Sequence, residues 1–252
     1  MPDHPGKPVS SIGHSNAPTP DLAGRVIAVC VGAAGLLRTE HREIASAFVK
    51  QSIDGQVALG PLGLTGDEHV YHGHGGPDMA LLAYPSEHYD HWRNAGIDLP
   101  PVGAMAENLT TEGLLETDVH IGDVFTLGTA TVQVCETRSP CFKIAARYGR
   151  PDLAVAVQST GFTGYLLRVL TPGEISAGDT MALVRRDDHG VSVAEAGRIM
   201  NVDRHDLDGA RRLLAIPALG ASARRTMAAR LHGHVADLQG LHTERLFGEP
   251  EP

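Results

Sequence analysis

Short apolar runs separated by turn residues dominate the chain up to about residue 186. They are rich in valine, leucine and isoleucine, which is typical of buried strands. These runs lie at residues 24–31, 79–84, 119–136, 165–169 and 180–184. Gly128-Thr129 divides the third run and predicts a hairpin, and Pro172-Gly173 predicts a turn between the last two runs. Many short strands in this arrangement predict a closed β-barrel rather than an alternating strand–helix sheet.

Short helices are expected to interrupt this strand pattern at three places. Pro85-Ser86 begins the first, in which Tyr89 and Trp92 fall on one face that we expect in the core. The other two cover residues 141–148 and 152–158, and a glycine follows each of them as a stop signal. The barrel is therefore expected to carry a few short helices.

From residue 187 the pattern becomes helical. Ser192 and Glu195 form a capping box for a helix that reaches about residue 200, and two further helices are expected at residues 206–214 and 222–238. A change from strand to helix periodicity at one point predicts a small separate module of three helices.

These patterns divide the chain into three parts. Residues 1–23 are rich in proline, serine and histidine and are predicted to form a disordered arm. Residues 24–186 are predicted to form the β-barrel domain, and residues 187–252 a small C-terminal three-helix domain. The predicted fold class is mainly β (α+β).

Composition limits the classes of function. The hydrophobic fraction is 42%, and no apolar run approaches the roughly 18 residues that a membrane helix needs, so we expect a cytoplasmic protein without a membrane segment. The net charge of −9 argues against general nucleic-acid binding. Three cysteines without a C-x-x-C pair argue against a disulfide framework or a structural zinc site. Cys30 and Cys135 lie inside strand-like runs and are expected to be packing residues.

The helical module is locally basic on this acidic protein. Its arginines are Arg198, Arg204, Arg211, Arg212, Arg224, Arg225 and Arg230. A helix-turn-helix that binds nucleic acid is one interpretation. The alternative is a docking or dimerisation module whose arginines form a solvated face. Dimerisation would make the protein an oligomer.

Cys141 is the cysteine with candidate chemistry. Ser139 and Pro140 are typical of the start of a helix, with Ser139 as the N-cap and Cys141 in the first turn. The helix dipole and the nearby charges of Arg138 and Lys143 favour the thiolate, which is a nucleophile and a soft metal ligand. The alternative is a buried cysteine with a structural role only.

A glycine-rich loop precedes the strand at residues 79–84. Glycines in the segment 63–76 let the backbone turn tightly or approach a ligand closely, and successive N–H groups in such a loop can bind a phosphate. His72, His74 and Asp78 also allow a zinc interpretation. A two-metal hydrolase pattern would need an acidic residue at position 76, which is glycine.

Five motifs occur together in a familiar order. They are Gly63-Leu-Thr-Gly-Asp67, His74-Gly-Gly-Pro-Asp78, Glu107-Asn-Leu-Thr110, Ile121-Gly-Asp123 and Arg138-Ser-Pro-Cys141. With these motifs the chain resembles MOSC-domain proteins of the YiiM type over roughly residues 24–240. The resemblance implies a barrel-like fold followed by a three-helix domain. His69-Val-Tyr-His72 departs from the pattern, because relatives of this type tend to carry Gln and Asp there.

The resemblance also implies roles for particular residues. In the wider MOSC group a cysteine is a sulfur carrier or a molybdenum ligand, and this role falls on Cys141. His74 and Asp78 are the further catalytic candidates. The candidates for binding the cofactor are Arg138, Lys143, Gly75, Gly76, Asn108 and Gly161.

Three functions remain open from the sequence. The first is a molybdenum-cofactor enzyme, with molybdopterin bound at Cys141, that reduces small N-hydroxylated substrates such as hydroxylaminopurines or amidoximes. No flavin, haem or iron–sulfur motif is visible, so a separate reductase would have to supply electrons. The second is a sulfur carrier with a persulfide on Cys141, and the third is a non-enzymatic binding module that uses its helical domain. Pyridoxal phosphate is disfavoured, because Lys143 is the sole plausible partner among three lysines.

Overall fold

The computed structural model describes residues 22–39, 43–71, 74–233 and 242–248 of the chain. Most of the predicted N-terminal arm lies outside these residues. The first strand begins at Ala23, one residue before the predicted boundary. No helix in the described part of the chain combines the length and the apolar composition needed to cross a bilayer.

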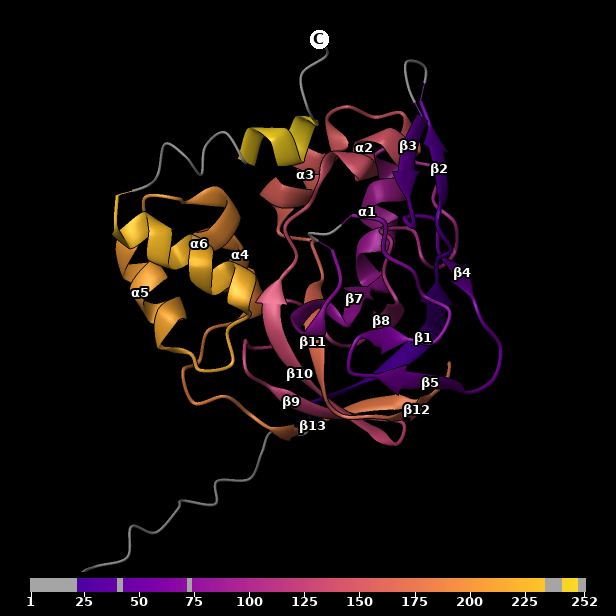
Figure 1. Cartoon of the computed structure of the whole chain (residues 1–252), viewed down its shortest axis with the longest axis horizontal. Helices are drawn as coiled ribbons and strands as arrows, with labels where there is room; N and C mark the ends of the chain where they lie inside the picture. The colour runs from indigo at the N-terminus through magenta and orange to yellow at the C-terminus, as the bar shows by residue number, and fades with distance from the viewer. Residues whose placement is uncertain (1–21, 40–42, 72–73, 234–241, 249–252) are drawn as a thin grey trace, which may run out of the picture.

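Seven strands of the described chain close into a barrel, as the sequence predicts (Figure 1). They are β1 (Ala23–Val31), β7 (Leu81–Pro85), β8 (Leu109–Glu112), β9 (Val124–Leu127), β10 (Ala130–Thr137), β11 (Tyr165–Thr171) and β13 (Thr180–Arg185). Their order is β13-β9-β10-β11-β7-β8-β1, and β1 pairs with β13 to complete the ring. The hairpin predicted at Gly128-Thr129 joins β9 to β10.

One pair in the ring, β7 and β8, is parallel, and the other pairs are antiparallel. Parallel neighbours need a crossover connection. Here it includes the 3-10 turn η2 (Ser86–His88) and helix α1 (Tyr89–Asn94). Tyr89 and Trp92 of α1 are buried as predicted, and the indole N–H of Trp92 donates to the Tyr84 hydroxyl at 2.7 Å.

Smaller strands decorate the barrel. A hairpin forms from β2 (Gly35–Arg38) and β3 (Glu43–Ser46), and β4 (Gln51–Ser52) pairs with β1. A second small sheet contains β5 (Val57–Gly60), β6 (Gly63–Leu64) and β12 (Gly173–Ile175). Two predictions need correction here. The strand predicted from residue 79 begins at Leu81, because η1 (Pro77–Met79) is a 3-10 turn, and the turn expected at Pro172-Gly173 contains the start of β12.

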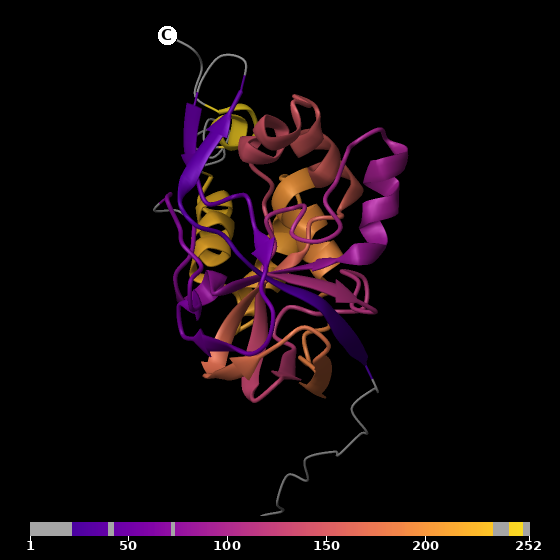
Figure 2. The same ribbon diagram turned by 90° about the vertical axis from the view of Figure 1, so that its right-hand side faces the viewer.

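Helices α2 (Phe142–Tyr148) and α3 (Leu153–Thr160) lie with α1 at one end of the barrel (Figure 2). Both end at a glycine in the left-handed region, as predicted. Their apolar residues join Tyr84 and Trp92 in a hydrophobic cluster that is distinct from the barrel interior. The chain between β10 and α2 therefore runs from one cluster to the other, and Cys141 lies on this connection.

The C-terminal region is helical, as predicted. It contains α4 (Val193–Gly197), the π-helical turn η3 (Arg198–Val202), α5 (Leu207–Ala215), α6 (Ala221–Leu231) and a last helix at residues 242–247. Ser192 caps α4 by accepting from the Glu195 N–H at 3.1 Å, which confirms the predicted N-cap. The Glu195 carboxylate of the predicted capping box pairs with Arg212 at 2.7 Å. The helix predicted to reach residue 238 ends at Leu231, and residues 234–241 lie outside the described chain. We call α4, η3, α5 and α6 the helical lobe.

Barrel residues bind the start of α6. The Gly220 N–H donates to the Cys135 carbonyl at 2.8 Å, and the Ala221 N–H donates to an Asp78 carboxylate oxygen at 2.8 Å. The Ala223 N–H donates to Glu136 at 3.3 Å. Two carboxylates at the positive end of a helix dipole stabilise the contact. The lobe is therefore docked on the barrel by its third helix.

Candidate functional site

The three cysteines have different surroundings. Cys30 and Cys135 are fully buried, which confirms their prediction as packing residues, whereas Cys141 is partly exposed. Burial raises the pKa of Cys30 to about 12 and also raises the pKa of Cys135, so both thiols stay protonated at neutral pH. Of the three, Cys141 is the thiol that a substrate or a cofactor can reach.

The start of α2 differs from the prediction. Cys141 itself is the N-cap residue, with an extended backbone at φ −127° and ψ 163°, and Ser139 is not the cap. The Ser139 hydroxyl instead donates to the side-chain oxygen of Asn201 at 2.9 Å. Asn201 belongs to η3 in the helical lobe. A tertiary contact thus replaces the local cap, because the lobe lies against this connection. Cys141 remains directly before the first helical turn.

Arg138 is a buried cation beside Cys141. Its side chain is 9% exposed, and its Nη1 is buried without a hydrogen-bond partner among the described residues. Burial lowers the pKa of Arg138, and the nearby Cys141 thiol acts in the opposite direction. No carboxylate in the described chain forms an ion pair with this guanidinium. A buried guanidinium without an ion-pair partner in the described chain favours a bound anion.

Lys143 and His74 add to the same electrostatic environment. Lys143 is buried in α2, where its Nζ donates to the Ala45 carbonyl at 3.4 Å and lies 5.8 Å from the centre of the Tyr71 ring. His74 is exposed at the surface. Desolvation, followed by the positive charges of Lys143 and Arg138, lowers its pKa to about 4. The imidazole of His74 is therefore neutral at pH 7 and can donate or accept a hydrogen bond.

Asn108 lies in a buried polar network rather than against Cys141. Its side-chain oxygen accepts from the Leu82 N–H at 3.1 Å, and its amide donates to the Cys30 carbonyl at 3.2 Å and to Asp67 at 2.8 Å. Asp67 also forms a buried ion pair with Lys50. The oxygen and the nitrogen of the Asn108 side chain both bind other parts of the protein. These bonds give no support to a contact between Asn108 and a cofactor, which stays a prediction.

Asp78 is placed between the barrel and the lobe. One carboxylate oxygen lies 2.8 Å from Arg168 of β11, and the other accepts from the Ala221 N–H of α6. These contacts give the carboxylate a structural function at the lobe junction. Electrostatic interactions connect His74 with Lys143 and Arg138, and Arg138 with Cys141, whereas the catalytic candidate Asp78 has other partners.

The candidate glycines have identifiable backbone functions. Gly75 has a φ of 81°, and a Cβ atom there would lie 2.6 Å from the ring of His69. Gly76 has a φ of 93° with open space around it, so its backbone is accessible to a ligand. Gly161 ends α3 in the left-handed region. Gly76 and Gly161 both have open space where a Cβ atom would lie, so the backbone of either could approach a ligand.

The zinc interpretation gains no support from the described residues, which include no group of three or more His, Cys, Asp or Glu side chains that could hold a metal ion. His72, one of the proposed ligands, lies outside the described chain.

Three residues near the site escaped the sequence analysis. Lys50 contributes positive charge at His74, Asn201 contacts Ser139, and Arg245 interacts electrostatically with Cys141. They come from the region before β4, from the lobe and from the last helix. Nothing local in the sequence connects them to Cys141, because each reaches it only through the tertiary fold.

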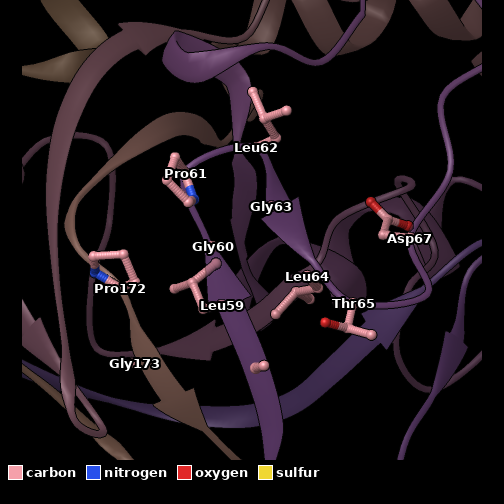
Figure 3. A pocket seen from close by; sticks show the side chains of 11 residues that line it. Leu59, Gly60, Pro61, Leu62, Gly63, Leu64, Thr65, Asp67, Pro172 and Gly173 are labelled. Atoms are coloured by element: carbon pink, nitrogen blue, oxygen red, sulfur yellow. The ribbon is translucent and has the colours of Figure 1, made fainter.

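A separate hollow of about 530 Å³ lies on the barrel surface, between the β5–β6 hairpin and the start of β12 (Figure 3). Its lining is mainly aliphatic and backbone, and its acidic residue, Asp67, is already paired with Lys50. Cys141 does not line it. This hollow offers no nucleophile or unpaired charge, so we place the candidate site at Cys141.

The arginines of the helical lobe are largely engaged within the protein. Arg198, Arg211 and Arg212 form ion pairs with neighbouring carboxylates. Arg224 and Arg230 donate to backbone carbonyls. These contacts reduce the positive charge available for a phosphate backbone, which disfavours the nucleic-acid interpretation.

Comparison with known proteins identifies the family. The MOSC domain model matches residues 70–182, and the model of the YiiM-like, 3-alpha helix domain matches residues 191–234. The chain belongs to the family of MOSC-domain proteins with a YiiM-like helical domain, which confirms the resemblance carried by the five motifs.

Individual relatives agree with this assignment. The chain is 40% identical to Protein YiiM of Escherichia coli strain K12 over 211 residues, which covers 81% of this chain and 91% of that protein. The crystal structure of YiiM from Geobacillus stearothermophilus has a TM-score of 0.71 at 34% identity and covers 82% of this chain and 99% of that one. A protein named Reductase from Gibberella moniliformis is 37% identical over 205 residues, 77% of this chain but 35% of that protein.

Proposed function

We propose that this protein is an oxidoreductase that binds the molybdenum cofactor, with the Cys141 thiolate as the protein ligand to molybdenum. The observation that carries the proposal is the setting of the thiol. Cys141 is partly exposed beside Arg138, a buried cation with an N–H that has no partner in the described chain. A soft thiolate suits a metal, and an unpaired guanidinium suits an anionic cofactor.

The residues present fit such a group. The pterin brings its own donors to the metal, so one protein thiolate suffices and a cage of several side chains is unnecessary. Arg138 and Lys143 would hold the phosphate of the cofactor, and the accessible backbone of Gly76 allows close approach. When bound, the cofactor supplies two-electron redox chemistry.

The substrates we propose are N-hydroxylated compounds such as hydroxylaminopurines or amidoximes. Their reduction takes up two electrons and two protons, breaks the N–O bond and yields the N–H compound and water. His74 is neutral at pH 7 and would bind the hydroxyl oxygen through its ring N–H. A neutral donor orients this oxygen without adding a further charge to a pocket that is already positive.

A separate protein would supply the electrons. The sequence has no flavin, haem or iron–sulfur motif. The fungal relative named Reductase supports a reductive function, and because the match covers 35% of that protein, its chain has room for further domains. We propose that this chain receives electrons from a separate reductase, whereas the longer fungal protein could carry an electron-donating domain in the same polypeptide.

The test is cofactor retention by protein made in a host that synthesises the molybdenum cofactor. The wild type should contain molybdenum and pterin in a ratio near one per chain, and Cys141→Ser should lose both, because a hydroxyl is a hard and essentially un-ionised donor. Cys135→Ala is the matched control. It removes a buried thiol, should cost about 1 kcal/mol of folding free energy, and should retain the cofactor.

Full metal content in Cys141→Ser would refute the assignment of the ligand. A wild-type protein that holds no molybdenum but releases sulfur from Cys141 on treatment with cyanide would support the alternative of a persulfide sulfur carrier. Both measurements use the same purified protein, so they separate the two functions directly.

A further inference from the structure

The last helix, residues 242–247, returns to the barrel and lies beside α3 (Figure 1). Arg245 makes this contact, because its guanidinium donates to the Gln158 side-chain oxygen of α3 at 3.0 Å and to the Asn201 oxygen of η3 at 3.3 Å. Arg245 also interacts electrostatically with Cys141. A residue near the C-terminus is thus brought to the candidate site.

The described partners of Arg245 are all neutral. Gln158 and Asn201 carry no charge, and the third, His242, contacts Nη2 of Arg245 at 2.9 Å. Burial and the charge of Arg245 lower the pKa of His242 to about 4, so this imidazole is neutral at pH 7. The Nε of Arg245 is buried without a hydrogen-bond partner among the described residues. Arg245 therefore has no ion-pair partner within 4.0 Å among the described residues, although the Glu136 carboxylate acts on it electrostatically.

Arg138 also has a buried side-chain nitrogen without a hydrogen-bond partner among the described residues. Asn201 contacts both arginines. The Asn201 side-chain oxygen contacts Ser139 and accepts from Arg245, and its amide lies 3.5 Å from the Arg138 carbonyl. Arg138 is buried and Arg245 is partly exposed, and both guanidiniums interact electrostatically with Cys141. An anion next to Cys141 could accept hydrogen bonds from the Arg138 Nη1 and Arg245 Nε groups that lack partners among the described residues.

We propose that Arg245 and Arg138 together bind a phosphate group next to Cys141. The inference rests on the proposed function only for the source of this phosphate, which would be the pterin cofactor. The anion site itself is a property of the protein without cofactor. The helical lobe, through Asn201, and the last helix, through Arg245, would then complete a pocket whose thiol comes from the barrel.

The test compares two alkylating reagents on cofactor-free protein, with the Cys141 peptide quantified by mass spectrometry. Iodoacetate is an anion and iodoacetamide is neutral, and both attack the same thiolate, so their rate ratio reports the local positive potential. Arg245→Gln should lower the iodoacetate-to-iodoacetamide ratio about three- to fivefold, as expected for losing one charge within several ångströms of the sulfur. Inorganic phosphate should slow the reaction with iodoacetate in wild type and much less in Arg245→Gln.

Arg211→Gln is the matched control, because Arg211 is an exposed arginine of the lobe paired with Asp208. Its ratio should equal that of wild type. Arg245→Lys keeps the charge and should retain most of the wild-type ratio, which distinguishes loss of charge from displacement of the last helix. An unchanged ratio in Arg245→Gln, or equal losses in the Gln and Lys variants, would overturn the proposal.

The outcome is independent of the test for the proposed function. If the ratio falls in Arg245→Gln while Cys141→Ser retains molybdenum, the anion site stands and the cofactor assignment fails. If the ratio is unchanged while Cys141→Ser loses molybdenum, the cofactor assignment stands and Arg245 is not part of the anion site.

Discussion

At the level of single residues, the buried carboxylate of Glu107 and the guanidiniums of Arg138 and Arg245 differ in how many hydrogen-bond partners they have. Glu107 is fully buried but accepts hydrogen bonds from the Tyr89 hydroxyl, from Thr110 at 2.9 Å and from the Met105 N–H at 2.8 Å. Arg138 and Arg245, in contrast, each keep a buried nitrogen without a partner in the described chain. A buried group without partners costs folding free energy, so such groups indicate a site that a ligand completes.

Glu136 leads to a prediction on pH. It is 4% exposed at the lobe junction, where burial raises its pKa to about 7 from an ordinary value of 4.5. Between these two pH values Glu136 is protonated in the folded protein but ionised in the unfolded chain. The contribution of Glu136 to the free energy of unfolding is therefore fully present below pH 4.5 and is lost as the pH rises toward 7. The cost should be on the order of 2–3 kcal/mol across this interval, since one pKa unit corresponds to about 1.4 kcal/mol.

Urea denaturation of wild type and Glu136→Gln between pH 4.5 and 8 measures this effect. The variant cannot ionise at this position, so its free energy of unfolding should fall less with pH than that of wild type. Parallel curves for the two proteins would show that Glu136 does not titrate in this range. The Ala223 N–H, Asp78, Arg225 and Arg245 are the neighbours that set its environment.

At the scale of elements, the short helices are defined by how they end. Helix α3 stops at Gly161, whose φ of 76° is unfavourable for residues with a side chain. Gly161→Ala should cost about 1–2 kcal/mol of folding free energy, and Gly161→Asn should cost less, because asparagine tolerates the left-handed region better. Chemical denaturation checks both values. Loss of bound cofactor with unchanged stability would instead support the cofactor role expected for this glycine.

The sequence predicts the elements better than it predicts the site. Strands and helix ends follow from local patterns, such as the apolar run of β1 and the glycine after α2. The cap at Ser139 was predicted wrongly because its hydroxyl contacts Asn201, 62 residues away. Arg245 was missed for the same reason, since its approach to Cys141 depends on a helix that returns from the C-terminus. Local rules fail where distant segments meet.

At the scale of the whole molecule, the barrel and the helical lobe share one hydrophobic cluster. It runs from Val132 of β10 to Ile199 of η3 and Met227 of α6, all fully buried. The caps that Asp78 and Glu136 provide at α6 add polar contacts to the same junction. The sequence predicts a change of architecture near residue 187, but the two parts bury their apolar surfaces against each other, so we expect them to be stable only together.

This shared cluster predicts a single cooperative unfolding transition. Trp92, the one tryptophan of the chain, reports on the cluster around α1, and far-UV circular dichroism reports largely on the helices. Both signals should change at the same urea concentration. Met227→Ala should lower both midpoints together, by about 2–4 kcal/mol in free energy, because it leaves a cavity in the shared core. If the helical signal were lost at lower urea while the Trp92 signal stayed at its wild-type midpoint, the lobe would be an independent domain. The contact of Asn201 with Ser139 would then have to hold the lobe at the Cys141 pocket without a shared hydrophobic core.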